Sequence, residues 1–201
     1  TGAGNTSVGQ GSGHAQTTAS NNTFVGQHAG AADTTGHHNV FVGQTCGQAI
    51  TTGLQNVAIG ALTFKETGVD ADGNVVLGYN AGTKITGDDN IAIGRNAHVF
   101  GTSCNNNVAV GYDAGKGSSG NTTGDNNVFI GGQAGLSIQS GLINTVIGSM
   151  AGYNITTGGG NTLLGRESGE AINSGEDNIC IGVNAGNYTN AITTGTKNIC
   201  I

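Results

Sequence analysis

The fold of this 201-residue chain follows from one short segment that recurs from end to end, Asn74-Val75-Val76-Leu77-Gly78-Tyr79-Asn80-Ala81-Gly82. With the Asn as position zero, aliphatic or β-branched residues occupy positions one and three, and Gly occupies positions four and eight. Successive anchors are mostly 17 residues apart. They are Asn5, Asn22, Asn39, Asn56, Asn74, Asn90, Asn107, Asn127, Asn144, Asn161, Asn178 and Asn198. A fixed period of this length predicts a repeat protein in which each unit forms one structural element.

The pattern inside each unit predicts β-structure. Apolar residues at positions one and three alternate as in a short strand, of about four residues, with one face in a core. Eleven residues after the anchor an Ile often recurs, which indicates a second short strand in units with Ile50, Ile85, Ile138, Ile155 and Ile172. Seventeen extended residues span roughly 56 Å, enough for one closed coil. We therefore predict an all-β, parallel β-solenoid of about 11–12 rungs, with residues 1–201 as a single array and a segment of a longer fibre.

The composition favours the same fold. The chain has 39 Gly and no Pro, and only 9% of its residues are charged. Collagen needs Gly at every third residue together with Pro, and disordered linkers combine low hydrophobicity with high net charge, so both classes are excluded. A chain in which every residue keeps its backbone N–H suits a hydrogen-bonded ladder on both sides of each rung. Aromatic residues make up 4% and Trp is absent, which disfavours an enzyme core built from large side chains.

Several classes of partner are disfavoured by the same residues. The six Lys and Arg are scattered singly, so no basic stripe is predicted to bind nucleic acid. No apolar run approaches the roughly 18 residues that span a bilayer, so we predict no membrane insertion. Cys46, Cys104, Cys180 and Cys200 form no CxxC pair and have no zinc-type spacing to His, so neither a metal nor another cofactor is predicted.

Two columns of the repeat are predicted to matter for assembly. Position two is almost always apolar although strand geometry turns it away from positions one and three, so we expect it to form an outer stripe for self-association into a homotrimer or an end-to-end filament. The alternative is that this stripe packs only under a neighbouring loop. The stripe consists of Phe24, Phe41, Ala58, Val76, Ala92, Ala109, Phe129, Val146, Leu163, Cys180 and Cys200. The second column is an Asn ladder of Asn22, Asn39, Asn56, Asn74, Asn90, Asn107, Asn127, Asn144, Asn161 and Asn178.

The repeats resemble those of known fibres. Asn21-Asn22-Thr23-Phe24-Val25-Gly26-Gln27-His28-Ala29-Gly30, Asn56-Val57-Ala58-Ile59-Gly60 and Asn107-Val108-Ala109-Val110-Gly111 resemble repeats of bacteriophage tail fibres and related surface-fibre proteins. They are also similar to the head repeats of trimeric autotransporter adhesins, although the period here is longer and a Ser after the Asn is usually missing. The resemblance implies a parallel β-roll at a cell or virion surface, with a role in attachment.

The residues give weaker support to other functions. The acids Asp88, Asp89, Asp125, Glu176 and Asp177 precede anchors, where solvated turn residues belong, so catalysis and Ca²⁺ binding are both disfavoured. A Thr rank would be a flat face of the kind that binds ice: Thr17-Thr18, Thr34-Thr35, Thr51-Thr52, Thr156-Thr157 and Thr193-Thr194. Glycan binding would use exposed aromatics, for which the candidates are Tyr79, Tyr112, Tyr153 and Tyr188.

The sequence as a whole predicts a non-enzymatic shaft or head segment of an extracellular, cell-surface or virion fibre. The longer loops, 116–125 and 187–197, are the predicted contacts with a cell-surface receptor or glycan. The alternative is a secreted solenoid binding surface for ice or glycan.

Overall fold

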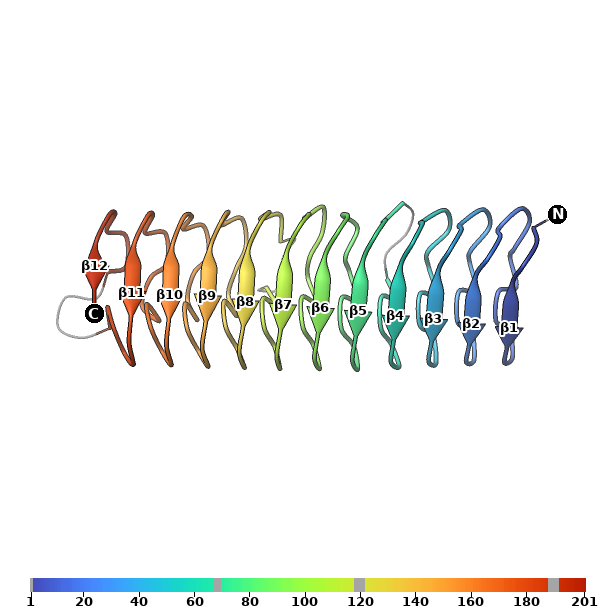
Figure 1. Ribbon diagram of the computed structural model, residues 1–201, viewed down its shortest axis with the longest axis horizontal. Helices are drawn as coiled ribbons and strands as arrows, with labels where there is room; N and C mark the ends of the chain where they lie inside the picture. The colour runs from blue at the N-terminus through green and yellow to red at the C-terminus, as the bar shows by residue number, and fades with distance from the viewer. Residues whose placement is uncertain (1, 67–69, 118–121, 188–191) are drawn as a thin grey trace.

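The chain winds into one rod of stacked coils, in which each coil contributes one short strand (Figure 1). The computed structural model describes residues 2–66, 70–117, 122–187 and 192–201. The strands in these ranges are β1 (Thr6–Val8), β2 (Thr23–Val25), β3 (Val40–Val42), β4 (Val57–Ile59), β5 (Val75–Leu77), β6 (Ile91–Ile93), β7 (Val108–Val110), β8 (Val128–Ile130), β9 (Thr145–Ile147), β10 (Thr162–Leu164), β11 (Ile179–Ile181) and β12 (Ile199–Cys200). None of the described residues lies in a helix, so no described segment could cross a membrane as one.

The strands form a single parallel sheet in sequence order, from β1 to β12. Each residue pairs with its equivalent in the next coil, as Val40 does with Thr23 on one side and Val57 on the other. The register holds across the 20-residue spacings too, since Ala109 pairs with Phe129. This confirms the predicted parallel β-solenoid with a repeat of about 17 residues.

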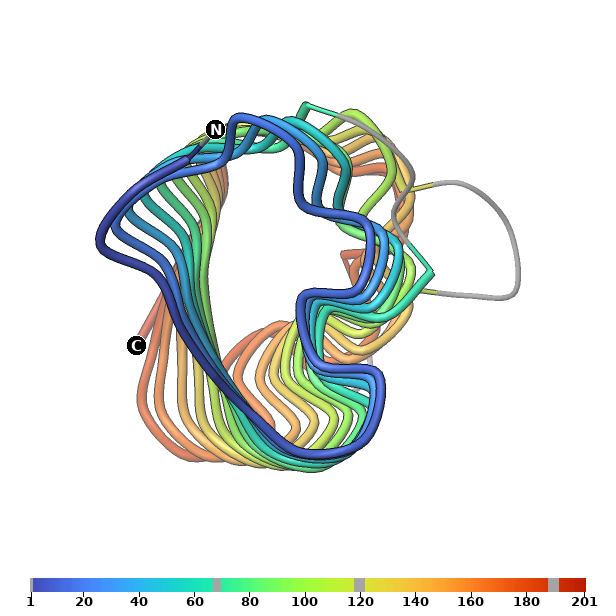
Figure 2. The same cartoon turned by 90° about the vertical axis from the view of Figure 1, so that its right-hand side faces the viewer.

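Four residues with positive φ bend each coil. In the coil anchored at Asn39 these are His38, Gly43, Thr45 and Gly47, with φ of 61°, 139°, 53° and 59°. In most coils Gly occupies two of the four positions, and Asn, Asp, Gln, His or another side chain adopts the left-handed conformation at the other two. Figure 2 shows the result end on: closed, irregular coils that stack and rotate slightly from one end to the other.

The expected second strand is absent from the described residues. The residues predicted to form it, Ile50, Ile85, Ile138, Ile155 and Ile172, are all buried, but they lie in turns or at isolated positions and belong to no strand. Their recurrence therefore indicates a buried column of the core and not a second strand. Backbone hydrogen bonds to the next coil form outside the regular strands as well. Burial alone explains the repeated Ile.

The interior is filled by position two of strands β2–β11, by a column of mostly Ala and by the recurrent Ile. Position two lies inside because strand residues two apart share a face, and the anchor Asn at position zero is itself buried. Positions one and three consequently face outward. The sequence prediction had the two faces of the strand reversed.

One glycine column is required by close stacking. Gly26, Gly43 and Gly60, four residues after their anchors, have φ of 137–139°, and a Cβ on each would lie 2.2–2.4 Å from the carbonyl oxygen of the next glycine in the column. No side chain can occupy that space without separating the coils. The constant Gly therefore sets how closely successive coils approach.

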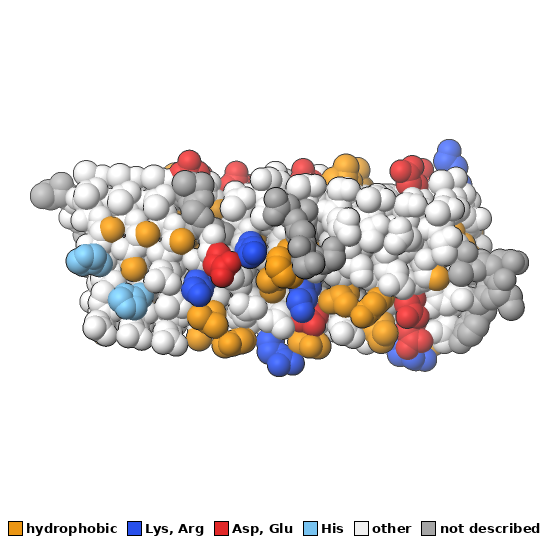
Figure 3. All heavy atoms as spheres, turned by 180° about the vertical axis from the view of Figure 1, so that it is seen from behind, with side chains coloured by type: hydrophobic (Ala, Val, Ile, Leu, Met, Phe, Trp, Pro, Cys, Tyr) orange, Lys and Arg blue, Asp and Glu red, His pale blue; other side chains and the backbone are white. Residues whose placement is uncertain are grey.

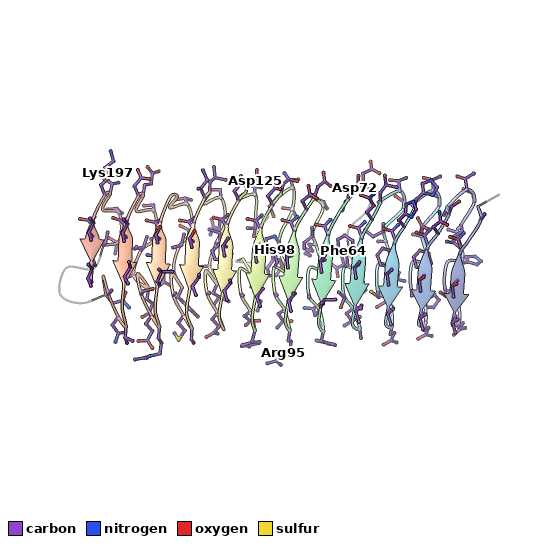
Figure 4. The ribbon with its side chains drawn as sticks, viewed as in Figure 1. Phe64, Asp72, Arg95, His98, Asp125 and Lys197 are labelled. Atoms are coloured by element: carbon purple, nitrogen blue, oxygen red, sulfur yellow. The ribbon has the colours of Figure 1, made fainter. Side chains whose placement is uncertain are left out.

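A second glycine column is interrupted twice by large residues. Phe64 and His98 stand eight residues after their anchors, where most coils have Gly, and both are buried with φ of 52° and 50°. Figure 4 shows both side chains behind the strands, in the body of the rod. In these two coils position two is Ala58 or Ala92, so the small residue leaves room for the large one.

Candidate functional site: the outer face of the sheet

The position-two residues do not form a surface stripe. Phe24, Phe41, Ala58, Val76, Ala92, Ala109, Phe129, Val146, Leu163 and Cys180 are each at most 1% exposed. Cys200, in β12, is half-buried. They pack on one another inside a single chain: the Phe24 and Phe41 rings are stacked with centroids 5.2 Å apart. The prediction that this column mediates self-association is therefore wrong, because its residues point into the core of their own coil.

The outward positions form the apolar surface in its place. We call this surface the outer face and define it as positions one and three of β1–β12, all of them Val, Ile, Leu or Thr. Exposure is largest for Val8 at 57% and Ile59 at 44% in the first coils, and for Ile181 at 41% and Ile199 at 71% in the last. No charged residue belongs to it. Its two columns run the length of the rod along the strands drawn in Figure 1.

Charges border the outer face along its edges. The edge before the strands carries Asp72, Asp88, Asp89, Asp125, Glu176 and Asp177, with Lys197 at the far end. The opposite edge, directly after the strands, carries Arg95 and Arg166, with Glu167 beside the latter. Figure 4 shows Asp72, Asp125 and Lys197 at one edge and Arg95 at the other. The side behind the sheet carries further charges of both signs (Figure 3).

The acidic edge is ordered by hydrogen bonds between coils. One carboxylate oxygen of Asp72 accepts the backbone N–H of Leu54, and Asp88 accepts that of Asp72, at 2.7 and 2.8 Å. Asn105 and Asp125 continue the column in the same way. Each carboxylate is thus held by its neighbour's backbone while the side chain stays at the surface. On the other edge, the Arg95 guanidinium lies over the Tyr112 ring, 4.5 Å from its centroid.

The anchor asparagines form a buried hydrogen-bond ladder through the rod. The side-chain oxygen of each Asn accepts the backbone N–H of the next anchor, as from Asn107 to Asn90 at 3.0 Å and from Asn127 to Asn107 at 2.9 Å. From Asn56 onward the side-chain amide of each anchor also donates to the previous anchor's oxygen. The same amide donates to a backbone carbonyl across its own coil, as Asn39 does to Gly53. Each Asn therefore closes its coil and fixes the next.

His98 and Cys104 are the one pair of buried chemically reactive side chains in contact within the described coils. The Nε2 atom of His98 lies 3.3 Å from the Cys104 sulfur, whose thiol reaches the Thr122 carbonyl at 3.4 Å. Burial lowers the pKa of His98 to about 4 and raises that of Cys104 to about 12. Both are therefore neutral at pH 7. The Nδ1 atom of His98 has no hydrogen-bond partner.

Asp33 is a buried carboxyl in the column that holds Ile in other coils. Its Oδ1 accepts the Gly36 N–H at 2.8 Å, and its Oδ2 accepts from the Asn22 side chain at 3.2 Å. Burial outweighs these bonds and raises the pKa of Asp33 to about 6. The repeat pattern had not indicated His98 or Asp33 as core residues. The signal was present, because each replaces a small or apolar residue in a column whose burial the repeat implies.

The remaining candidate site residues do not lie together in one site. Asp88, Asp89, Asp125, Glu176 and Asp177 line the acidic edge, and the described residues contain no group of three or more His, Cys, Asp or Glu placed to hold a metal. No pocket opens in the described part of the surface. Tyr79 and Tyr112 are exposed on the Arg edge. Tyr188 and parts of the loops 116–125 and 187–197 lie outside the described residues.

Residues of the Thr rank form hydrogen bonds between coils of the rod. The Thr17 hydroxyl donates to the Thr34 carbonyl at 2.8 Å, and the Thr34 hydroxyl donates to Thr51 at 3.0 Å. Thr156 bonds to Asn173 in the same way. The first Thr of these pairs thus links coils, and the second is exposed at Thr18, Thr35 and Thr157. Thr17 is exposed as well.

Comparison with known proteins adds no relative: no family model, no curated protein and no solved structure matches the chain.

Proposed function

We propose that this chain is a stiff structural segment, shaft or head, of an extracellular or virion fibre, and that it works by self-association rather than by catalysis. The observation that carries the proposal is the uninterrupted Asn ladder, which links every anchor from Asn5 to Asn198 through the core. Longer spacings do not break it, because Asn107 and Asn127 are joined like the others.

The ladder supports a mechanical role because it adds side-chain bonds to the backbone bonds between coils. Buried amide pairs in a low-dielectric interior are strong, and breaking one leaves polar groups unpaired at about 1–3 kcal/mol each. Bending the rod would stretch the ladder and the Gly column on one side. A segment built in this way keeps its length and direction, which is what a fibre that presents a distant tip requires.

The stacking also explains how such a segment can tolerate insertions. The 20-residue spacings before Asn127 and Asn198 add chain to a loop while the anchor stays in register. Loops of this kind can differ between coils without disturbing the rod. We place contact with a receptor or glycan in such loops or in a tip beyond this segment.

Immunoelectron microscopy on the organism or virus that makes the protein tests the proposal. Antibodies raised against the purified segment should label a slender appendage at regular distance from the surface. Diffuse label in the surrounding medium, with no appendage, would contradict it. The hydroxyls of Thr17, Thr34 and Thr156 already donate to the next coil, so they do not favour the ice-binding alternative.

A further inference from the structure

We infer that the outer face is the interface with a second copy of this chain, packed side by side with the two rods pointing the same way. The inference rests on the proposed function, which it deepens by naming the partner and the surface. The outer face takes the place of the position-two column as the proposed interface, because that column is buried in its own chain.

The size of the outer face is the first argument. Eleven three-residue strands each present two outward side chains, and all are partly or well exposed. At on the order of 50 Å² of exposed side chain each, the face offers roughly 1,100 Å², against about 800 Å² per partner in a standard protein–protein interface. The largest apolar patch on a typical monomer is about 300–600 Å². The outer face is thus large enough to hold two chains together.

The composition of the outer face selects a partner with the same surface. Its two columns contain only Val, Ile, Leu and Thr, and they repeat once per coil at about 4.8 Å. A second copy offers an apolar surface with the same spacing over the same length, so the outward side chains of each coil meet those of the equivalent coil of the other rod. The net charge of −6 is carried elsewhere, so the two outer faces meet without like charges between them.

The charged edges select the relative direction of the rods. A two-fold axis parallel to the rods reverses the partner's strands, so that the acidic edge of one copy lies against the Arg edge of the other. Arg95 follows β6 while Asp88 and Asp89 precede it, so they meet at equal height in such a pair. Rods pointing in opposite directions would instead bring the two acidic edges together, which costs affinity.

Sedimentation equilibrium on the 201-residue chain tests this interface. The wild type should sediment as two chains at micromolar concentration. The variant V57K/I91K/V128K places lysines in the outer face on alternate coils and should raise the dissociation constant at least about 100-fold. The control T18K/T35K/T157K adds the same charge at exposed positions on another side of the coil and should leave the dimer intact. Circular dichroism establishes that both variants stay folded.

A charge exchange tests the direction. Arg95→Asp should weaken the dimer about tenfold at low salt, since the two-fold axis repeats the ion pair and each exposed pair contributes up to about 1 kcal/mol. Adding Asp88→Arg to the same chain should restore it, because the pair then re-forms with its signs exchanged. Failure of the rescue overturns the parallel arrangement.

Other outcomes overturn the inference. A single-chain mass for the wild type at 100-fold higher concentration means that the face is free, and thermal hysteresis from that monomer assigns it to ice. A three-chain mass contradicts the two-fold pairing. A single-chain mass would also contradict the self-association in the proposed function, whereas the fibre location is tested separately by the antibody label, so the two failures are distinguishable.

Discussion

The coils of β2 and β3 and the coils of β4 and β6 fill the same core in opposite ways. In β2 and β3 the large residue is at position two, Phe24 or Phe41, and position eight is Gly. In β4 position two is Ala58 and Phe64 stands at position eight; its ring meets Phe41 edge to face at 6.3 Å. In these four coils one large residue fills the core, and the position that supplies it changes.

This comparison separates two reasons for Gly. At position eight a Cβ on Gly47 would lie 2.4 Å from the Phe41 ring, so the side chain of the same coil excludes it. Phe64 adopts the same positive φ without Gly because Ala58 leaves space. At position four the obstacle is the next coil's backbone, which no core substitution removes. Position eight can therefore vary together with position two, and position four cannot vary.

The largest effect is expected from emptying the β4 core. Phe64→Gly should lower the free energy of unfolding by about 3–5 kcal/mol, as for other large-to-small aromatic substitutions. Ala58→Phe alone should cost about 1–3 kcal/mol by overpacking. The double variant reproduces the arrangement of β3, so a thermal or chemical denaturation cycle should show a favourable coupling of at least about 2 kcal/mol. Additive losses would contradict the exchange of volume.

A substitution in the Asn ladder should cost nearly as much as emptying the core. Asn107→Asp keeps the shape and the acceptor but replaces the amide that donates to Asn90 and Gly124, and it buries a charge. We expect a loss of about 3 kcal/mol or more at pH 7, partly recovered at pH 4 when the carboxyl is protonated. Asn5→Asp, in the less buried first coil, is the matched control and should cost under about 1 kcal/mol, because water solvates its charge. Equal losses of stability at both sites would show that the burial of Asn107 does not set the cost of the substitution.

Alanine substitution tests whether the position-four Gly sets the spacing of the coils. Gly43→Ala puts a Cβ 2.2 Å from the Gly60 carbonyl at a φ of 139° and should cost about 3 kcal/mol. Gly132→Ala, in open space in another coil, should change stability by less than about 0.5 kcal/mol. Urea denaturation of both gives the difference directly. A cost for Gly132→Ala as large as that for Gly43→Ala would rule out coil spacing as the cause.

His98 makes the β6 coil sensitive to acid where its counterpart with Phe64 is not. Its folded pKa is about 4 and its unfolded value is 6.5, so the unfolded chain binds more protons between them. Stability should therefore fall as pH is lowered from 7, by about 2 kcal/mol at pH 5. His98→Phe should abolish this slope and raise the midpoint of unfolding below pH 6. A slope unchanged by the substitution would assign the acid sensitivity to other groups.

Asp33 should change stability with pH in the direction opposite to His98, and its effect should be the smallest of those predicted. Its pKa is raised to about 6, so the folded chain binds the proton more tightly and this site favours folding as pH falls from 7 toward 4. Asp33→Asn keeps an acceptor for the Gly36 N–H and removes the buried charge. We expect a gain of about 1–2 kcal/mol at pH 7 that disappears near pH 4. A loss at pH 7 would mean that the ionised form is needed.

Most of the fold could be predicted from the sequence because period and register are one-dimensional properties. The regular recurrence of Asn74 and its equivalents sets the number of coils, and the lack of Pro fits ladders on both sides. The direction of each strand face could not be assigned from apolarity, since Val75 and Val76 are equally apolar. What decides it is Asn74: its amide needs buried partners, so position two, on the same face, is inside. The exchange between Ala58 and Phe64 also required three-dimensional contacts.

Thiol labelling of two adjacent residues tests the central assignment of inside and outside most directly. In the dissociated V57K/I91K/V128K background, Ile179→Cys places a thiol on the outer face beside native Cys180, which burial keeps at a pKa of about 12. Mass spectrometry of the labelled peptide separates the two positions. The structure predicts that residue 179 reacts at least about 100-fold faster than Cys180, and that Cys180 reacts only after unfolding. Equal or faster labelling of Cys180 in the folded chain would contradict the account.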